Sequence, residues 1–332
     1  MESKKKKEGY SQTLKSVETE DWLDYHAIRP FSYLLAKIFA YFGMHPNTVT
    51  IWSMVFGVAS CAFFVHGSFY YEGSHGLLMN LIAIVLLMIA DILDCSDGQL
   101  ARLTGKKSHL GRILDGIAGI VWFVPIYLAI VWRFYEHHEL EFCWLGISDT
   151  PAHVLIATSV VLVLALISGF MGMGGQQRLA DYYIQVHLFF QKGEKGSELD
   201  NSRRQQQLYE QLPADAPFYE RLFQWSYVGY TRKQEQATPQ LQRLMSLLRR
   251  KYGSADQMSL DVREAFHRES LSLMKWNGLL TFNFRSFWFF LFCLLDVPAF
   301  NFLFEIIVMQ LLTNYINHRH EAFSRRIADK LS

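Results

Sequence analysis

The sequence predicts an all-α fold: a polytopic membrane protein with six transmembrane helices, an N-terminal interfacial helix and a helical cytoplasmic insertion. Three observations predict it. Hydrophobic residues make up 51% of the 332 residues, they gather in blocks, and most charged residues lie between the blocks. The blocks are about 20 residues long, which is the length a helix needs to cross a hydrocarbon core of ~30 Å.

Four segments follow from the positions of these blocks. Residues 1–47 are expected to form a cytoplasmic N-terminus with an amphipathic helix, and residues 48–175 to hold the first four transmembrane helices. Residues 176–275 are polar and mixed in charge, which predicts a cytoplasmic helical insertion, and residues 276–332 hold two more spans and a cytoplasmic tail. The six expected spans are, in chain order, Thr48–Phe69, Gly76–Asp94, Ile113–Phe134, Ala152–Met173, Trp276–Val297 and Pro298–Ile316.

The segment before the first span, EDWLDYHAIRPFSYLLAKIFAYFG, mixes aromatic and aliphatic residues with Arg29 and Lys37. Part of it is expected either to lie in the membrane interface as an amphipathic helix or to pack against the spans as an additional helix. The pattern alone leaves both alternatives open.

The basic residues predict which side of the membrane each loop occupies. Short flanking loops that are rich in Lys and Arg tend to stay in the cytoplasm. Basic residues precede the first span, at Lys4–Lys7 among others, and follow the last one, while the loop after the second span carries Arg102 and Lys106. The loop Gly67–His75 has no Lys or Arg. Both termini and the end of the second span are therefore expected at the cytoplasmic face.

The second span ends in three aspartates, within the stretch DILDCSDGQLARLTG. Because each helical residue turns by about 100°, Asp94 and Asp97 share a narrow helical face with their small neighbours Gly98 and Ala101. Asp91 lies on the edge of that face, one turn deeper. A carboxylate at membrane depth costs about 2.5–3.5 kcal/mol on insertion scales, so several on one face indicate function. The alternative is that these acids merely flank a helix end.

A fourth acid, Asp115, lies across the loop at the start of the third span, one turn after Gly111. Grouped carboxylates repel one another unless protons or cations neutralise them. Hard oxygen ligands favour Mg²⁺, Mn²⁺ or Ca²⁺, and Mg²⁺ typically takes one or two carboxylates together with substrate phosphates. The small residues leave room for a substrate, and Arg102 adds positive charge at the rim. Together these features predict phosphoryl-group transfer.

The spacing of these residues resembles the signature of the CDP-alcohol phosphotransferase family, Asp-x2-Asp-Gly-x2-Ala-Arg-x8-Gly-x3-Asp-x3-Asp. The matching residues are Asp94, Asp97, Gly98, Ala101, Arg102, Gly111 and Asp115. The stretch HPNTVT at the head of the first span also resembles the Pro-Asn turn of the family. The resemblance covers roughly Pro46–Arg133 by motif and the other spans by topology only.

The resemblance implies an enzyme that transfers a substituted phosphate from a CDP-alcohol to a hydroxyl acceptor and releases CMP, in phospholipid or sphingolipid synthesis. It implies Mg²⁺ or Mn²⁺ bound by Asp94, Asp97 and Asp115. The residues that it places near the cytidine nucleotide are Asn47, Gly98, Ala101, Arg102 and Gly111. It further implies a homodimer, a cytoplasmic active site and two substrates of which one is a lipid.

One signature position departs from the family. The last aspartate should stand at position 119, where this chain has Gly119, and no Asp or Glu occurs from Gly116 to Tyr135. In the family that aspartate is taken as the general base for the attacking hydroxyl, and glycine cannot accept a proton. Three interpretations stay open. Asp91 replaces the base and is catalytic beside Asp115, or the acceptor needs little base assistance, or the protein is a non-catalytic subunit that binds CDP-alcohols or nucleotides.

Other residues point to weaker alternatives. A divalent-cation transporter would need polar groups at the midplane of its spans, which the first, third and fourth spans almost lack, and no nucleic-acid motif stands out. Arg285 in the fifth span is expected either to bind a phosphate on the acceptor or to extend to the cytoplasmic interface. Glu305 in the sixth span is expected to hydrogen-bond other helices or to line the pocket. The stretch HHELE, at His137–Glu141, resembles a zinc-binding helix but lacks the second His at the required spacing.

Overall fold

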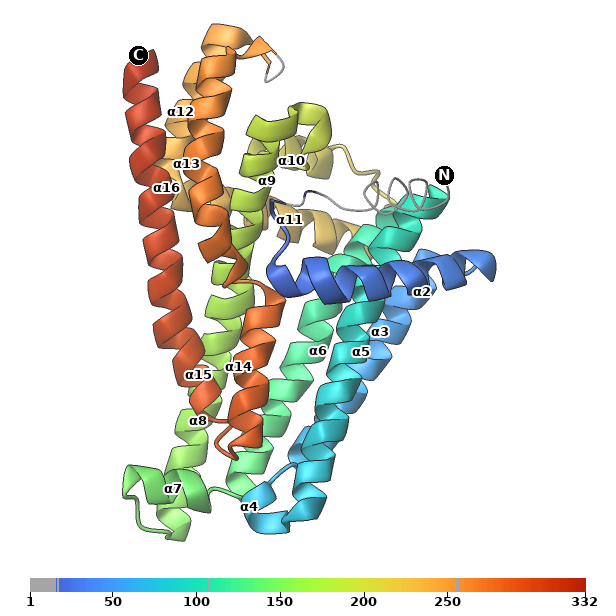
Figure 1. Ribbon diagram of the computed structural model, residues 1–332, viewed down its shortest axis with the longest axis vertical. Helices are drawn as coiled ribbons and strands as arrows, with labels where there is room; N and C mark the ends of the chain where they lie inside the picture. The colour runs from blue at the N-terminus through green and yellow to red at the C-terminus, as the bar shows by residue number, and fades with distance from the viewer. Residues whose placement is uncertain (1–15, 17, 107, 255–256) are drawn as a thin grey trace. The chain divides into compact units, whose positions relative to one another are not determined.

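The computed structural model describes residues 16, 18–106, 108–254 and 257–332, and every regular element in these residues is a helix (Figure 1). The all-α prediction is therefore confirmed for the described part of the chain. The basic run Lys4–Lys7 lies outside the described residues. The chain divides into two compact units, residues 1–173 with 282–308 and residues 174–281 with 309–332.

The first unit is built around long helices. Its elements are η1 (Asp24–Ile28, a π-helical turn), α2 (Arg29–Tyr41), α3 (Pro46–Val65), α4 (Phe69–Glu72), α5 (Ser74–Thr104), α6 (His109–Glu136), α7 (Glu139–Leu145), α8 (Pro151–Met171), α14 (Phe282–Leu294) and α15 (Phe300–Phe304). Helix α3 packs against both α5 and α6, α6 against α8, and α14 against α5. In Figure 1, α4 and α7 lie at one end of α5 and α6, and α2 runs across the other end.

Four helical segments are long and apolar enough to cross a membrane: Pro46–Val65, Ser74–Thr104, Ile113–Glu136 and Pro151–Lys192. They contain most of the first four predicted spans, and the last of them continues from α8 into the second unit. The fifth and sixth spans stay predictions. Helix α14 has 13 residues, a length of about 20 Å, which is less than the ~30 Å hydrocarbon core.

The prediction of one continuous helix over Trp276–Val297 is wrong. Helix α13 (Leu260–Gly278) ends after an Asn-Gly pair, and α14 begins only at Phe282. The chain tightens at the break because the Leu279 N–H donates to the carbonyl of Trp276 at 3.1 Å, and Thr281 Oγ1 donates to the Gly278 carbonyl at 2.6 Å. Asn-Gly is a common turn signal, so the break could have been found in the sequence.

The second unit is also helical in its described residues. Its elements are α9 (Arg178–Lys192), η3 (Glu194–Gly196), α10 (Ser202–Glu210), α11 (Phe218–Ala237), α12 (Pro239–Tyr252), α13 and α16 (Gln310–Leu331). Helices α12 and α13 pack against α16, and α9 packs against α13. Two π-helical segments, η2 (Gly172–Gln177) and η5 (Glu305–Met309), stand where the chain passes between the units. The cytoplasmic position of the predicted insertion stays a prediction.

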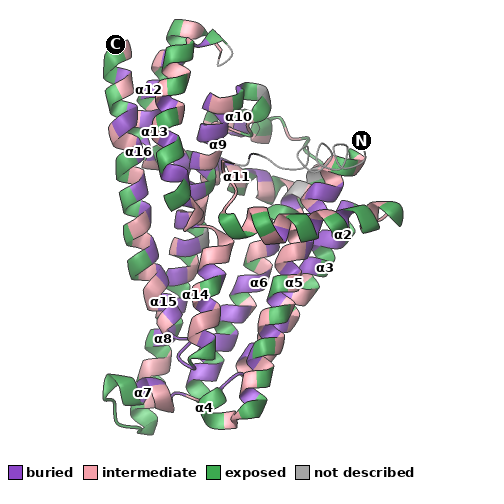
Figure 2. Ribbon diagram, in the orientation of Figure 1, coloured by how far each residue is buried: buried purple, intermediate pink, exposed green. Residues whose placement is uncertain are grey.

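Helix α2 has one packed side and one exposed apolar side. Ser32 and Ala36 are fully buried, and Ser32 Oγ donates to the carbonyl of Ile92 on α5 at 3.1 Å. Phe31, Leu34 and Ile38 are exposed on the same helix, and exposed residues dominate its visible side in Figure 2. The helix therefore packs against α5, and its exposed apolar side favours the predicted position in the membrane interface.

Helices α3 and α6 approach closely at Gly57. A Cβ atom added there would lie 2.4 Å from Cδ1 of Trp122, whose side chain is buried. We therefore expect Gly57→Ala to lower the free energy of unfolding by about 1–3 kcal/mol, measured by thermal or denaturant unfolding in detergent.

Gly229 in α11 is the matched control, because a Cβ there meets no atom within 4 Å. Gly229→Ala should leave stability unchanged or raise it slightly, since alanine favours helix. Equal effects of the two substitutions would contradict the close approach at Gly57.

Candidate active site

The acidic residues predicted for the second span all lie on α5. This helix does not end at Asp94 but continues to Thr104, where Gly105 with φ 69° terminates it. Asp97 is buried, with 5% of its surface exposed, while Asp91 and Asp94 are half-buried. Because Asp91, Asp94 and Asp97 lie within one continuous helix, their positions relative to one another are fixed by the geometry of that helix.

Asp97 is fixed by a residue that the sequence reasoning missed. Thr50 on α3 is buried and donates a short hydrogen bond from Oγ1 to Asp97 Oδ2. Thr50 follows Asn47 by three residues, so both lie on one face of α3. That spacing was the available signal, because a polar residue one turn after the Pro-Asn turn lies on the side that faces α5.

The start of α6 is joined to the start of α3. Ser108 caps α6 by accepting the Gly111 N–H at 2.9 Å, and its hydroxyl donates to Asn47 Oδ1 at 3.2 Å. A Cβ atom at Gly111 would lie 2.8 Å from Asn47 Oδ1 and 2.9 Å from Ser108 Oγ. Glycine at 111 therefore allows Asn47 and the N-terminus of α6 to approach each other.

The acids of α5 lie near enough to Asp115 of α6 for their charges to repel one another. The charge of Asp94 is opposed first by Asp115 and then by Asp97 and Asp91, and Asp115 also acts on Asp97. Asp115 itself is exposed. Among the described residues, Asp94, Asp97 and Asp115 do not bring one oxygen each within 4.8 Å of one another. Asp115 is thus near enough to act on the charges of Asp94 and Asp97, but the three side chains do not form a closed set of ligands.

The remaining signature residues lie around these acids. The guanidinium of Arg102 folds over Gly98, because its Nη1 lies 3.5 Å from the position of a Gly98 Cβ, and Arg102 acts electrostatically on Asp97. Ala101 is half-buried on the same helix. Gly119 lies on α6 one turn after Asp115 and is half-buried.

Asp91 faces a second group of charged residues that the sequence reasoning missed. Its electrostatic neighbours are Asp24, Arg29 and Asp21, in the segment before the first span. The Asp24 N–H donates to Asp21 Oδ1 at 2.7 Å, and Arg29 pairs with Glu20 at 3.0 Å. The acids in EDWLD recur three and four residues apart, which was the only signal in the sequence. The N-terminal segment thus contributes charge beside the signature helix.

Asp24 predicts a pH dependence of stability. Burial, and next the nearby Asp21, raise the pKa of Asp24 from 3.8 to about 6. Because the folded protein binds this proton more tightly than the unfolded chain, the stabilising contribution is present below pH 3.8 and is lost as the pH rises to about 6. Asp24→Asn should therefore stabilise the protein at pH 7.5, by no more than roughly 3 kcal/mol, and have little effect near pH 4.

Thermal unfolding in detergent at the two pH values measures this effect. The exposed Asp215 provides the control, and Asp215→Asn should change stability little at either pH. A stabilisation by Asp24→Asn that is equal at both pH values would contradict the prediction.

Arg285 forms a buried ion pair instead of extending to the membrane interface. Its Nη1 lies 2.9 Å from Glu305 Oε1, and both side chains are at least 95% buried. Glu305 Oε2 also accepts hydrogen bonds from Tyr127 at 2.6 Å and from Ser168. The interface prediction for Arg285 is wrong because Glu305 provides a buried partner. The prediction that Glu305 hydrogen-bonds other helices is confirmed.

Comparison with known proteins gives one match. The family model described as CDP-alcohol phosphatidyltransferase matches residues 43–177, which contain α3 to α8 and every signature residue. Comparisons with curated proteins and with solved structures give no match. The family match and the four apolar helices together indicate an integral membrane protein.

Proposed function

We propose that the protein transfers a substituted phosphate from a CDP-alcohol to a hydroxyl acceptor, because residues 43–177 match the CDP-alcohol phosphatidyltransferase family model. CMP leaves, and the product enters phospholipid or sphingolipid synthesis. The observation that carries the proposal is the electrostatic grouping of Asp94, Asp97 and Asp115 from two helices of that domain.

We further propose that these three carboxylates hold Mg²⁺ or Mn²⁺. Oδ1 of Asp94 is buried and has no hydrogen-bond partner among the described residues, and it lies among like charges. Such an oxygen fits a hard divalent cation, and the exposed Asp115 can rotate toward it. When bound, the cation neutralises charge on the diphosphate and on the leaving CMP.

The other signature residues fit roles around the nucleotide. Gly98 presents backbone without a side chain, and the Arg102 guanidinium beside it can pair with a phosphate oxygen. The Asn47–Ser108 hydrogen bond joins the start of α3 to the start of α6, beside the signature residue Gly111. These groups would orient the donor so that the acceptor hydroxyl attacks the phosphorus in line, which supplies much of the rate in phosphoryl transfer.

Asp91 is our candidate for the base that Gly119 cannot provide. It is half-buried, it acts electrostatically on Asp94, and the acids of the N-terminal segment lie beside it. A positioned base contributes about 10²–10⁴-fold. We expect Asp91→Asn to lower kcat at least about 100-fold and Gly119→Asp to change it less than about threefold. A sharp rise with Gly119→Asp and normal turnover of Asp91→Asn would exclude Asp91 as the base.

The decisive experiment measures CMP release by the purified protein. A panel of CDP-alcohols, both lipid and soluble, is combined with hydroxyl acceptors and with Mg²⁺ or Mn²⁺. Release with at least one pair, abolished by chelation of the cation, supports the proposal. Binding of CDP-alcohols without any release would favour the alternative of a non-catalytic nucleotide-binding subunit. Cross-linking in the membrane tests the homodimer that the family suggests.

A further inference from the structure

Three histidines surround one glutamate at the end of the first unit that carries α4. Oε2 of Glu72 lies 2.8 Å from Nδ1 of His75, while its Oε1 lies 3.8 Å from Nε2 of His137 and 3.9 Å from Nδ1 of His66. Asp94 lies nearly 20 residues further along α5 than His75, a distance of about 30 Å along the helix. This cluster is therefore separate from the candidate active site.

The cluster forms where helix ends meet. His66 is the C-terminal cap of α3, and His137 is the C-terminal cap of α6. Glu72 ends α4, and Gly73, with φ 59°, reverses the chain so that His75 stands in the first turn of α5. Helix C-termini carry partial negative charge, so two long helices and one carboxylate favour a cation at this point.

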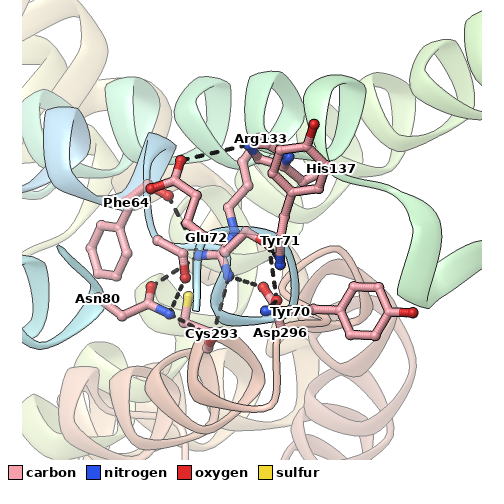
Figure 3. A network of polar contacts seen from close by, with 11 residues as sticks. Phe64, Tyr70, Tyr71, Glu72, Asn80, Arg133, His137, Cys293 and Asp296 are labelled. Carbon is pink, nitrogen blue, oxygen red and sulfur yellow. Dashed lines mark hydrogen bonds and ion pairs between the residues drawn. The ribbon is translucent and has the colours of Figure 1, made fainter. Parts of the chain in front are cut away.

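A buried polar network holds the ends of α4 and α6 in place (Figure 3). Asp296 accepts the Tyr70 N–H at 2.5 Å and the Ser68 hydroxyl at 2.9 Å, and it pairs with Arg133. Arg133, 1% exposed, also donates to Asn80 Oδ1 at 2.9 Å. Glu72 is thereby fixed through α4.

His137 is held on the other side of the cluster. Its backbone N–H donates to the Arg133 carbonyl at 2.8 Å, and its ring lies 4.3 Å from that of Tyr71. The side chain is 11% exposed, and its Nδ1 is buried without a hydrogen-bond partner among the described residues. Two of the four groups are thus positioned by the fold, whereas His66 and His75, 60% and 65% exposed, can rotate.

We propose that Glu72, His66, His75 and His137 bind a transition-metal cation of the Zn²⁺ type. Imidazole nitrogens and one carboxylate oxygen are the ligands that Zn²⁺ takes in a tetrahedral site, with bonds of about 2.0–2.2 Å and therefore ligand separations of roughly 3.4 Å. The separations in the structure are 2.8 Å from Glu72 Oε2 to His75, and 3.8 and 3.9 Å from Glu72 Oε1 to His137 and His66. No three of these four residues bring one ligand atom each within 4.8 Å of one another in the described chain, so the proposed site requires the exposed rings of His66 and His75 to rotate when the ion binds.

The test uses the full-length protein in detergent, without a histidine tag and with Asp94→Asn to weaken the acidic site. Co²⁺ absorption and Zn²⁺ titration calorimetry measure binding. We expect one Co²⁺ per chain with a tetrahedral spectrum, displaced by Zn²⁺, and a Zn²⁺-dependent rise in the thermal midpoint. Glu72→Gln, His137→Gln and His75→Ala should each weaken Zn²⁺ binding at least about 100-fold.

His153→Ala is the matched control, because this exposed histidine of α8 contacts Ser148 through its ring. The variant should bind Zn²⁺ as the parent does. His75→Ala keeps the test valid if the less exposed variants fail to fold. No binding by the parent, or unchanged binding in Glu72→Gln and His75→Ala, would overturn the proposal. Neither result would affect Mg²⁺- or Mn²⁺-dependent CMP release by the wild-type protein, which tests the proposed function separately.

Discussion

Replacing Asp94 with asparagine should lower CMP release by on the order of 1,000-fold while making the protein more resistant to heat. The loss follows from the proposed metal ligation, because a bound cation contributes several kcal/mol to transition-state stabilisation. The gain follows from the geometry, because Asp94 lies among three other carboxylates and its Oδ1 has no hydrogen-bond partner in the described part of the chain. Asparagine removes that repulsion with little change of shape.

The two effects are measured separately, by CMP release with saturating Mg²⁺ and by thermal unfolding with a chelator. A gain of about 1–2 °C corresponds to about 1 kcal/mol for a chain of this length. Asp215→Asn, at an exposed acid outside the signature, is the control and should change neither quantity. Normal CMP release by Asp94→Asn would contradict the proposal that Asp94 binds a catalytic metal ion. An Asp94→Asn variant that is inactive because it is unfolded would contradict the predicted gain in thermal stability.

Glu305→Gln should destabilise the protein by about 3–5 kcal/mol. The substitution leaves the Arg285 guanidinium charged and without its partner carboxylate in an environment where both groups are at least 95% buried. An uncompensated buried charge costs about this much, whereas an exposed ion pair contributes ~1 kcal/mol or less. The hydrogen bonds from Tyr127 and Ser168 would also lose a charged acceptor.

A double substitution tests whether the charge is the cause. Arg285→Met with Glu305→Met removes both charges at similar volume and should recover most of the lost stability, measured by thermal unfolding. The exposed pair Arg243–Asp329, at 2.8 Å, is the control, and Asp329→Asn should cost ~1 kcal/mol or less. A double variant that is less stable than Glu305→Gln alone would mean that packing, not charge, dominates at this site.

The sequence predicted the part of the candidate site that lies within single helices. Asp91, Asp94 and Asp97 occupy one helix, so a rotation of about 100° per residue was sufficient to place them relative to one another. The partnership with Asp115 required the resemblance to a family, because helical periodicity does not relate two helices. The fold class could likewise be predicted, because the length of an apolar block depends only on consecutive residues of one segment.

The sequence did not predict contacts that depend on packing between distant segments. Nothing in the sequence relates Thr50 to Asp97 or Glu305 to Arg285, because the residues of each pair lie on different helices and come together only when these helices pack. Asp24 is likewise far from Asp91 along the chain. The break before Phe282 was missed because hydropathy was read as continuous across an Asn-Gly turn. Apart from this break, each miss concerns how one helix packs against another.

The indole of Trp122 occupies the space that a side chain at Gly57 would take. Trp122 follows Asp115 by seven residues on α6, and Gly57 follows Thr50, the partner of Asp97, by seven residues on α3. The same contact, two turns from Asp115 and from Thr50, thus sets the spacing between α6, which carries Asp115, and α3, which carries the partner of Asp97. A side chain at position 57 would therefore change the spacing between α3 and α6, and with it the position of Asp115 relative to Asp97, although neither Gly57 nor Trp122 belongs to the signature.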